Sequence, residues 1–346
     1  MNNRILLGMS GGTDSSVAAI LLLEQGFDVI GITFRFWEEG ENQHLADAQR
    51  LALQLGIEHI AYDAREVFQK TVVQYFTDEY LAGRTPFPCA VCNNQLKWDL
   101  ILQEADRLGC DRVAMGHYTQ IAQDDGKYFI HEGVDPDKDQ SFFLWGLKQE
   151  QLARIMFPLG GFHKSQVREM AAQRGFNYVS EKKDSLGACF CSGDYRPFLK
   201  SQLTHPDEWI YPGNFVDEFG KVLGTHQGYP LYTVGQRRGL IHLNRQVFVK
   251  EIHPSTNEIV LSPLQSLYKS EFLVRDYRLV DETLFSHGFD TVTRIRYRKQ
   301  NNLSRIEITD NTHLRVVLEQ PLEAIAPGQT AVFYRDGKVL GGGFIV

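Results

Sequence analysis

Three short segments of the chain carry residue types that can do chemistry. Residues 8–16 read Gly-Met-Ser-Gly-Gly-Thr-Asp-Ser-Ser and lie between a predicted strand and a predicted helix. Glycines let the backbone approach an anion closely, and the start of a helix directs free N–H groups at it. The Gly-Lys-Ser/Thr ending of a Walker A loop is absent. The segment therefore predicts a phosphate-binding loop of another type, and the plainer alternative is a glycine-rich turn capped by Asp14.

The other two segments contain cysteines. Cys89 and Cys92 form a CxxC pair after two prolines, and Cys92 comes just before the predicted helix Asn94–Leu108. A thiol near a helix N-terminus has a lowered pKa, which favours the nucleophilic thiolate. Cys189 and Cys191 lie in a glycine-containing segment, and we expect only one of them to face a cleft. The alternatives are small residues in a loop or core. A zinc site is disfavoured, because no second CxxC pair stands at finger spacing.

Composition limits the class of protein. With 346 residues, 43% of them hydrophobic and 23% charged, the chain is expected to be a soluble protein of two or three domains. Five cysteines in a chain of this length argue against a disulfide framework. Val17–Leu23 is too short to span a bilayer and the first residues do not resemble a signal peptide, so we expect a cytoplasmic protein. The net charge of −7 means that any RNA contact must come from a local basic patch.

The elements that must position these segments fall into two parts. Strands and helices alternate in the first part, which predicts a parallel sheet with helices on both faces and a ligand at the carboxyl ends of the strands. The predicted strands are Arg4–Met9, Asp28–Phe34, His59–Tyr62 and Arg112–Met115, and the predicted helices are Ser15–Gln25, Asn42–Leu55, Glu66–Ala82 and Asn94–Leu108. Short strands predominate after about residue 200, and Phe272–Val346 predicts a small β-barrel.

A basic stretch lies within this barrel region. Arg294, Arg296 and Arg298 alternate at period two, so in a strand all three would project from one face. Such a stripe favours binding to an RNA backbone. The alternative is a solvated basic face without a function.

Taken together and in order, several segments resemble the tRNA-specific 2-thiouridylase family of ATP pyrophosphatases. They are SGGTDSSV, GRTPFPCAVCN, MGHYTQI, KDQSFFL, FPLG, KKDSLGACF, YTVGQRRGL and RIRYRKQ. The resemblance implies an α/β catalytic domain of the adenine nucleotide alpha hydrolase type at residues 1–203. A small central β-rich domain that contacts tRNA is implied at 204–270, and a C-terminal β-barrel at 271–346.

The resemblance also implies an activity. Such an enzyme uses ATP and Mg²⁺ to replace the C2 carbonyl oxygen of uridine 34 with sulfur, and releases AMP and pyrophosphate. Its expected partners are the anticodon stem-loop of tRNA and a sulfur-donor or relay protein, with no membrane. The rival readings are an ATP pyrophosphatase that adenylates a small metabolite, and a tRNA-binding paralogue without catalysis.

Individual roles follow from the same resemblance. The catalytic cysteines are Cys92, which releases the product, and Cys189, which carries the sulfur. The nucleotide-binding positions are Gly8, Met9, Ser10, Gly11, Gly12, Thr13, Asp14, Ser15, Ser16, Phe34 and Gly116. The positions that bind the base or the tRNA are His117, Lys138, Asp139, Gln140, Arg296, Tyr297 and Gln329. The chain departs from the family at residues 191–196, where the usual Ile-Gly-Glu-Arg run is absent, and at Cys89, where many members have Asp.

Two routes to sulfur transfer remain open at this point. In the first, Cys189 carries a persulfide, and Cys92 frees the product by forming a disulfide with Cys189. This route requires the two Cα atoms to come within roughly 7 Å in some state. In the second, Cys89, Cys92 and Cys189 hold a [4Fe–4S] cluster with one open iron that binds sulfide.

Overall fold

The computed structural model describes residues 3–37, 43–176, 187–191, 193–285, 288–297 and 300–346. Its N-terminal part is built around a five-stranded parallel sheet with the strand order β3-β2-β1-β4-β7. The strands are β1 (Arg4–Gly8), β2 (Asp28–Arg35), β3 (Glu58–Asp63), β4 (Arg112–Met115) and β7 (Ile155–Met156). The centres of β1 and β2 are fully buried, as expected for parallel strands covered on both faces. The predicted parallel α/β sheet is therefore confirmed.

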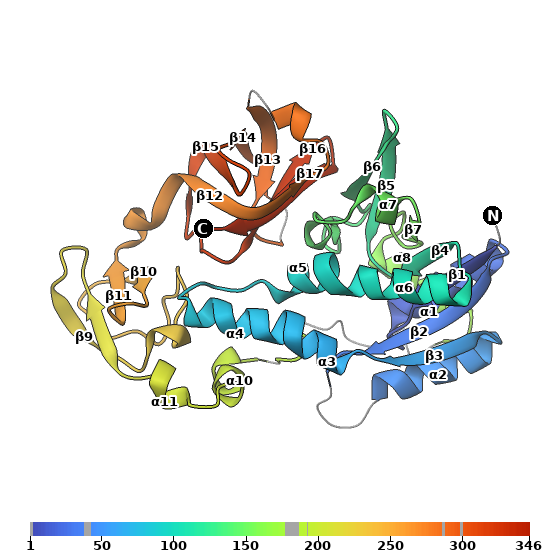
Figure 1. Ribbon diagram of the computed structural model, residues 1–346, viewed down its shortest axis with the longest axis horizontal. Helices are drawn as coiled ribbons and strands as arrows, with labels where there is room; N and C mark the ends of the chain where they lie inside the picture. The colour runs from blue at the N-terminus through green and yellow to red at the C-terminus, as the bar shows by residue number, and fades with distance from the viewer. Residues whose placement is uncertain (1–2, 38–42, 177–186, 192, 286–287, 298–299) are drawn as a thin grey trace.

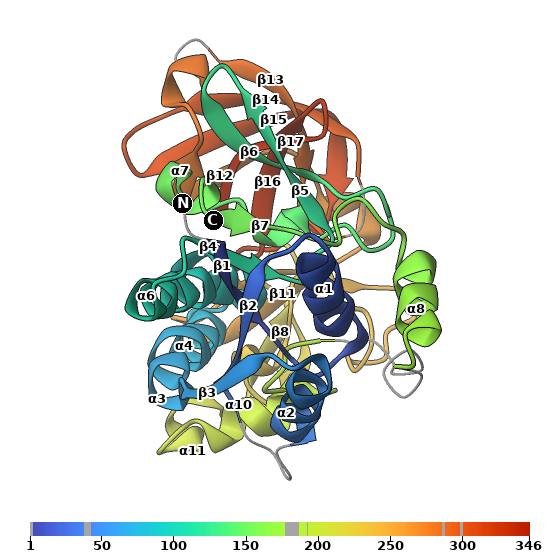
Figure 2. The same cartoon turned by 90° about the vertical axis from the view of Figure 1, so that its right-hand side faces the viewer.

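Helices cover both faces of this sheet (Figure 2). One face packs against α1 (Thr13–Glu24), α2 (Gln43–Leu55) and α8 (Lys164–Gln173), whose apolar residues share one buried cluster with the strands. The other face belongs to a second cluster that includes two longer helical segments. The first segment runs through α3 (Arg65–Phe68), the π-helical turn η1 (Gln69–Val73) and α4 (Gln74–Leu81). The second runs through α5 (Pro88–Cys92), the π-helical turn η2 (Asn93–Lys97) and α6 (Trp98–Leu108).

The helix that carries Cys92 begins earlier than the sequence indicates. Its first residue is Pro88 rather than Asn94, so both thiols of the CxxC pair lie within the helix. Proline is well tolerated at the first helical position, because its missing N–H would have no intrahelical partner there. The helix ends normally at Gly109, which adopts a left-handed conformation with a φ of 68°.

Two β-rich units follow the sheet domain (Figure 1). The first is a four-stranded sheet of order β10-β11-β8-β9, formed by β8 (Gly213–Val216), β9 (Val222–His226), β10 (Phe248–His253) and β11 (Glu258–Ser262). Two short helices, α10 (Tyr195–Ser201) and α11 (Pro206–Trp209), lead into it. The remaining short helices are α7 (Gln149–Leu152) and the 3₁₀ turns η3 (Ser141–Phe143), η4 (Tyr229–Leu231), η5 (Leu264–Leu267) and η6 (Glu282–Phe285).

The second unit confirms the predicted β-barrel. Its strands run in the order β12-β15-β14-β13-β16-β17, and pairing of β12 with β17 closes the barrel. They are β12 (Tyr268–Leu279), β13 (Phe289–Arg294), β14 (Asn302–Ile308), β15 (His313–Glu323), β16 (Thr330–Arg335) and β17 (Lys338–Ile345). A hairpin of the sheet domain, β5 (Thr119–Asp124) and β6 (Lys127–Glu132), attaches to β17 through the pairing of His131 with Lys338. No helix in the described parts of the chain is both long and apolar enough to cross a membrane.

The predicted basic stripe on the barrel is wrong at its first member. Strand β13 ends at Arg294, whose side chain is turned into the protein and is 5% exposed. There it pairs with Glu132, lies 3.5 Å from Asp139 and stacks over the ring of Tyr334. Arg296 is exposed, and Arg298 lies outside the described residues. Arg294 is buried where it pairs with two acidic side chains of the sheet domain. The alternation of arginines along the strand carries no information about such distant partners.

Candidate functional site

A cavity of about 480 Å³ lies at the carboxyl ends of β1, β2 and β4. This is the edge at which open parallel sheets bind their ligands. Of the predicted site residues, the cavity is lined by Gly8, Met9, Ser10, Asp14, Ser15, Phe34, Cys92, Gly116, His117, Gln140 and Cys189. The cavity therefore brings together the predicted phosphate loop, the two predicted catalytic thiols and one predicted base-binding residue.

The loop after β1 folds around its own hydroxyl groups. The backbone N–H of Ser10 donates to Ser15 Oγ at 3.2 Å, and Ser16 Oγ donates to the carbonyl of Gly12 at 2.8 Å. Gly11 has a φ of +67°, and a Cβ at this position would lie 2.7 Å from the backbone of α2. Glycine is required there on both grounds. Four residues of the loop do not line the cavity and instead support the loop on its side away from the cavity: Gly11, Gly12, Thr13 and Ser16.

Asp14 is held by two groups that the sequence analysis did not single out. Its carboxylate accepts a hydrogen bond of 2.6 Å from Tyr118 Oη, and Lys164 Nζ lies 2.8 Å from each of its oxygens. Lys164 stands at the start of α8 and is 8% exposed. Gly116 packs directly against Asp14, since a Cβ there would lie 3.0 Å from the Asp14 carbonyl carbon. The pairing with Lys164 spans 150 residues, so no local sequence signal could have found it.

An aromatic wall closes another side of the cavity. Phe34 stacks on Phe36 with ring centroids 5.5 Å apart, and its edge meets Tyr62 at the same distance. Phe34 and Phe36 both line the cavity. A planar apolar surface beside a phosphate-binding loop has the chemistry to hold the base of a nucleotide.

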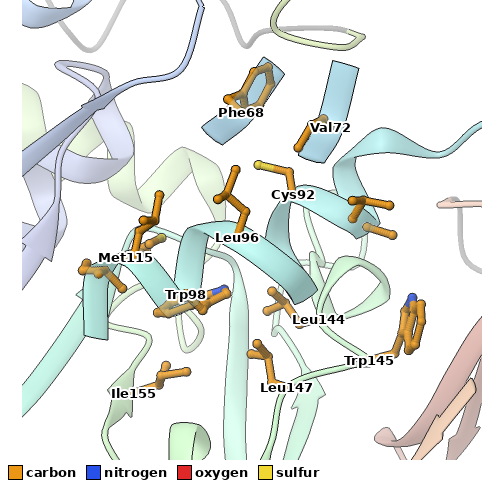
Figure 3. Packing of buried hydrophobic residues seen from close by; sticks show 14 of the residues in the cluster. Phe68, Val72, Cys92, Leu96, Trp98, Met115, Leu144, Trp145, Leu147 and Ile155 are labelled. Atoms are coloured by element: carbon orange, nitrogen blue, oxygen red, sulfur yellow. The ribbon is translucent and has the colours of Figure 1, made fainter. Parts of the chain in front are cut away.

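The two predicted catalytic cysteines reach the cavity from different elements. Cys92 comes from the helix and is only 8% exposed, and it lies below the residues Phe68 and Val72 (Figure 3). Cys189 lies in a tight turn in which Ala188 pairs with Cys191, and its side chain is exposed. The next residue, Phe190, is 2% exposed and anchors this turn in the aromatic core.

Cys191 and Cys89 differ from these two. The side chain of Cys191 is buried on the core side of the turn, so only Cys189 of that pair faces the cavity, as predicted. Cys89 is half-buried near the start of the helix and does not line the cavity. All five cysteines lie among the described residues, and all are free thiols in this structure. In this conformation neither the predicted disulfide nor any other is formed.

The prediction of a lowered pKa for Cys92 is wrong in this structure. Burial raises the pKa of Cys92 and of Cys89 above the ordinary thiol value, and the positive charge of Lys97 opposes that shift only in part. Burial likewise raises the pKa of Cys189, to about 11, and the nearby Cys92 adds to the shift. Desolvation is the largest cause for both thiols of the CxxC pair, because the helix begins at Pro88 and buries them.

His117 is a neutral lining residue. Burial lowers its pKa to about 3, and the positive charge of Lys97 acts in the same direction. Its ring packs 5.6 Å from the ring of Trp98. Within the described residues, the buried Nδ1 atom has no hydrogen-bond partner. A buried polar atom without a partner is energetically costly and calls for an explanation, such as a partner that is supplied by a ligand.

Gln140 is held rigidly at the cavity wall. Its backbone N–H donates to Tyr118 O at 2.8 Å, and its side-chain oxygen accepts from Tyr118 N at 2.9 Å. Asp139 is buried beside it and accepts hydrogen bonds from Gly133 N and from Ser141, so it supports the segment and does not line the cavity. Lys138 is half-buried and also lies away from the cavity wall.

The three predicted tRNA positions on the barrel do not line the cavity, and two of them, Tyr297 and Gln329, lie near the start of the cysteine helix. The side-chain amide of Gln329 donates to the carbonyls of Thr85 and Pro86, each at 3.1 Å, just before the helix. Tyr297 packs on Phe143 at 4.9 Å, and Phe143 stacks in turn on Phe87, the residue that precedes the helix. Arg296 is exposed on the same loop as Tyr297.

The thiols do not form a metal site in this arrangement. Across the described residues, no three His, Cys, Asp or Glu side chains come together to hold a metal ion. Cys89, Cys92 and Cys189 therefore do not fit the three-thiolate set that a cluster with one open iron requires.

Comparison with known proteins places the chain in a family. A protein of Bacteroides fragilis named tRNA-specific 2-thiouridylase MnmA 1 is 54% identical, and the match covers 99% of this chain and 97% of that protein. The chain belongs to the tRNA-specific 2-thiouridylase family. MnmA 2 of Phocaeicola vulgatus is 52% identical over 100% of this chain and 98% of its own length. MnmA of Amoebophilus asiaticus is 42% identical, with coverages of 99% and 95%.

Three domain families match consecutive stretches of the chain. Residues 3–193 match the family described as the tRNA methyl transferase HUP domain, and residues 197–263 match the tRNA methyl transferase PRC-barrel domain. Residues 269–345 match the family described as the aminomethyltransferase beta-barrel domain. These stretches correspond to the sheet domain, the central sheet and the closed barrel of the structure.

Proposed function

We propose that the protein is an ATP-dependent tRNA-uridine 2-sulfurtransferase that acts on uridine 34. The observation that carries the proposal is that Cys92 and Cys189 line the same cavity as the phosphate loop. The relatives named tRNA-specific 2-thiouridylase match the chain along its whole length and support the same reaction.

The carbonyl at C2 of uracil needs activation, because its oxygen is a poor leaving group. In the proposed first step this oxygen attacks the α-phosphate of ATP, and pyrophosphate leaves into the loop around Ser10 and Ser15. Backbone N–H groups at the start of α1 and the ammonium of Lys164 favour the charge that develops there. Mg²⁺ bound with the ATP would neutralise phosphate charge, and Asp14 is the cavity carboxylate placed to share in holding it.

Sulfur transfer follows in two displacements. The terminal sulfur of a persulfide on Cys189 attacks C2, and AMP departs with the former carbonyl oxygen. The thiolate of Cys92 then attacks the Sγ atom of Cys189, which forms a Cys92–Cys189 disulfide and leaves sulfur on C2. An external thiol reduces the disulfide, and a persulfide-carrying donor protein reloads Cys189. We derive no step through an iron–sulfur cluster, because the described thiols do not form its ligand set.

The uracil must leave the anticodon stack to reach such a cavity. Gln140 presents a fixed amide at the cavity wall and His117 presents a buried ring nitrogen, and we propose that both contact the base. Arg296 and Tyr297 lie outside the cavity on the barrel, where we propose that they contact the tRNA backbone and an exposed base.

The test is incubation of the protein with ATP, a persulfide donor and unmodified tRNA, followed by mass analysis of the nucleosides. We expect 2-thiouridine together with AMP and pyrophosphate, and Cys92→Ser and Cys189→Ser should each abolish it while tRNA binding persists. Cys89→Ser is the matched control, because Cys89 does not line the cavity and the persulfide route does not use it. Pyrophosphate release that does not depend on tRNA would contradict the proposal.

The same control separates the two sulfur-transfer routes. If Cys89→Ser retains full activity and the anaerobically purified wild-type protein is active without iron, the persulfide route stands. Loss of activity in Cys89→Ser, together with iron and sulfide in stoichiometric amounts, would replace it with the cluster route.

A further inference from the structure

A π-helical turn after Cys92 determines which of the following side chains faces the cavity. In an α-helix, residues five apart differ by about 140° around the axis and face different surroundings. Residues 93–97 instead form a π-helical turn with i to i+5 hydrogen bonding, which widens the helix by one residue. Cys92 and Lys97 consequently both line the cavity, one wide turn apart. Such π-helical turns occur often at functional sites.

Lys97 is the cation that the thiols face. Its side chain is half-buried, and within the described residues its ammonium has neither a carboxylate partner nor a hydrogen bond. Lys164 differs from Lys97, because it does not line the cavity and is already paired with Asp14. The field of Lys97 acts on Cys89, Cys92 and Cys189 and, for Cys92, it is the charged group with a resolved influence.

Within the described residues, the other charged and titratable groups that line the cavity, apart from the cysteines, come from other elements. Asp14 belongs to the phosphate loop, Arg35 to the end of β2, His44 to the start of α2 and His117 to the segment after β4. Among these groups, His117 is kept neutral by burial and so brings no positive charge to the thiols. Arg35 also lines the cavity, but Lys97 is the cation that acts on Cys92, so Lys97 can compensate a thiolate at that position.

We propose that Lys97 is the residue that activates Cys92, by supplying the positive charge against which this buried thiol ionises. The proton of Cys92 goes to solvent, and the resulting thiolate pairs with the ammonium, which remains charged. The ammonium of Lys97 has no anionic partner while the thiol of Cys92 is protonated. Ion pairing therefore stabilises only the thiolate, which is the nucleophilic form of Cys92. The catalytic use of this pairing rests on the proposed function, since it is Cys92 that must attack the disulfide-bonded sulfur.

The experiment measures how fast iodoacetamide alkylates Cys92 in the full-length protein between pH 6 and pH 11, with peptide mass analysis. Lys97→Met should shift the midpoint upward by about one pH unit, which means about tenfold slower alkylation at pH 8. Lys97→Arg should restore most of the wild-type profile, because it keeps the charge. Lys97→Gln provides a second neutral replacement with a polar end.

Two controls make the result specific. Lys70→Met removes an exposed lysine that is paired with Glu66 on a neighbouring helical segment, and it should leave the profile of Cys92 unchanged. Cys110 is an internal reference, because the charges that act on it are those of other residues such as Arg4 and Arg154. An unshifted Cys92 profile in both neutral variants, or an equal shift of Cys110, overturns the proposal.

The assay needs neither ATP nor tRNA, so it separates the two proposals. If the wild-type protein makes no 2-thiouridine while the alkylation profile depends on Lys97, the proposed function fails and the charge effect stands. If thiolation proceeds at the wild-type rate in Lys97→Met, Lys97 has no part in the reaction.

Discussion

Removing the guanidinium of Arg294 tests whether the junction between the sheet domain and the barrel is a desolvated ion-pair network. The Arg294 side chain is 5% exposed, and its partners Glu132 and Asp139 are 18% and 10% exposed. Arg294→Ala would leave both carboxyl groups without their cation in a place that water scarcely reaches. Breaking a buried pair in this way costs about 3–5 kcal/mol. The variant also loses the cation–π contact of Arg294 with the Tyr334 ring at 3.9 Å, and the free energy of that contact is included in the same cost.

The measurement is urea denaturation of the variant and the wild type, compared with Arg305→Ala. Arg305 pairs with Asp290 on the same barrel, but its side chain is 46% exposed and that of Asp290 is 81% exposed. We expect the control to lose less than about 1 kcal/mol. Adding Glu132→Gln to Arg294→Ala should recover part of the loss, because one uncompensated acid is then removed. Equal and small losses in the two arginine variants would refute the desolvation argument.

Three further predictions concern the surroundings of the cavity. Gln329→Ala removes two hydrogen bonds to the carbonyls of Thr85 and Pro86, each worth about 1 kcal/mol. Hydrogen exchange of the backbone amides in residues 85–92 should therefore accelerate, and an unchanged exchange rate would contradict this. The pKa of His117 falls from 6.5 to about 3 on folding, so the stability that its neutral ring provides is full above pH 6.5 and is lost as the pH falls toward 3. His117→Gln should therefore flatten the decline of the urea midpoint between pH 6.5 and pH 4, and identical slopes would count against it. Arg296→Ala should weaken tRNA binding and lower the slope of log K against log salt by about 1, whereas an unchanged slope would show that Arg296 contacts no phosphate.

The sheet and the general position of the site were predictable from the sequence. Alternating buried strands and helices with glycine ends are local signals, and they place the loop after β1 and the residues after β4 at one edge of the sheet. The closed barrel was also predictable, because short strands with turn residues between them carry their own pattern.

The charges around the thiols were not predictable in the same way. Lys164 meets Asp14 across 150 residues, and Arg294 meets Asp139 across 155 residues, so neither pairing leaves a trace in local spacing. Lys97 is only five residues from Cys92, yet an α-helical register would turn it away from the cavity. The raised pKa of Cys92 depends on how deeply the helix is packed, which is a property of the whole fold.

The contact of Gln329 and Pro327 with the segment before the cysteine helix has a consequence for synthesis of the chain. The backbone of Thr85 finds its partners in residues 327–329, which the ribosome adds more than 240 residues later. The hydrogen bonds that tie the segment before Cys92 to the barrel can therefore form only after residues 327–329 have been synthesised.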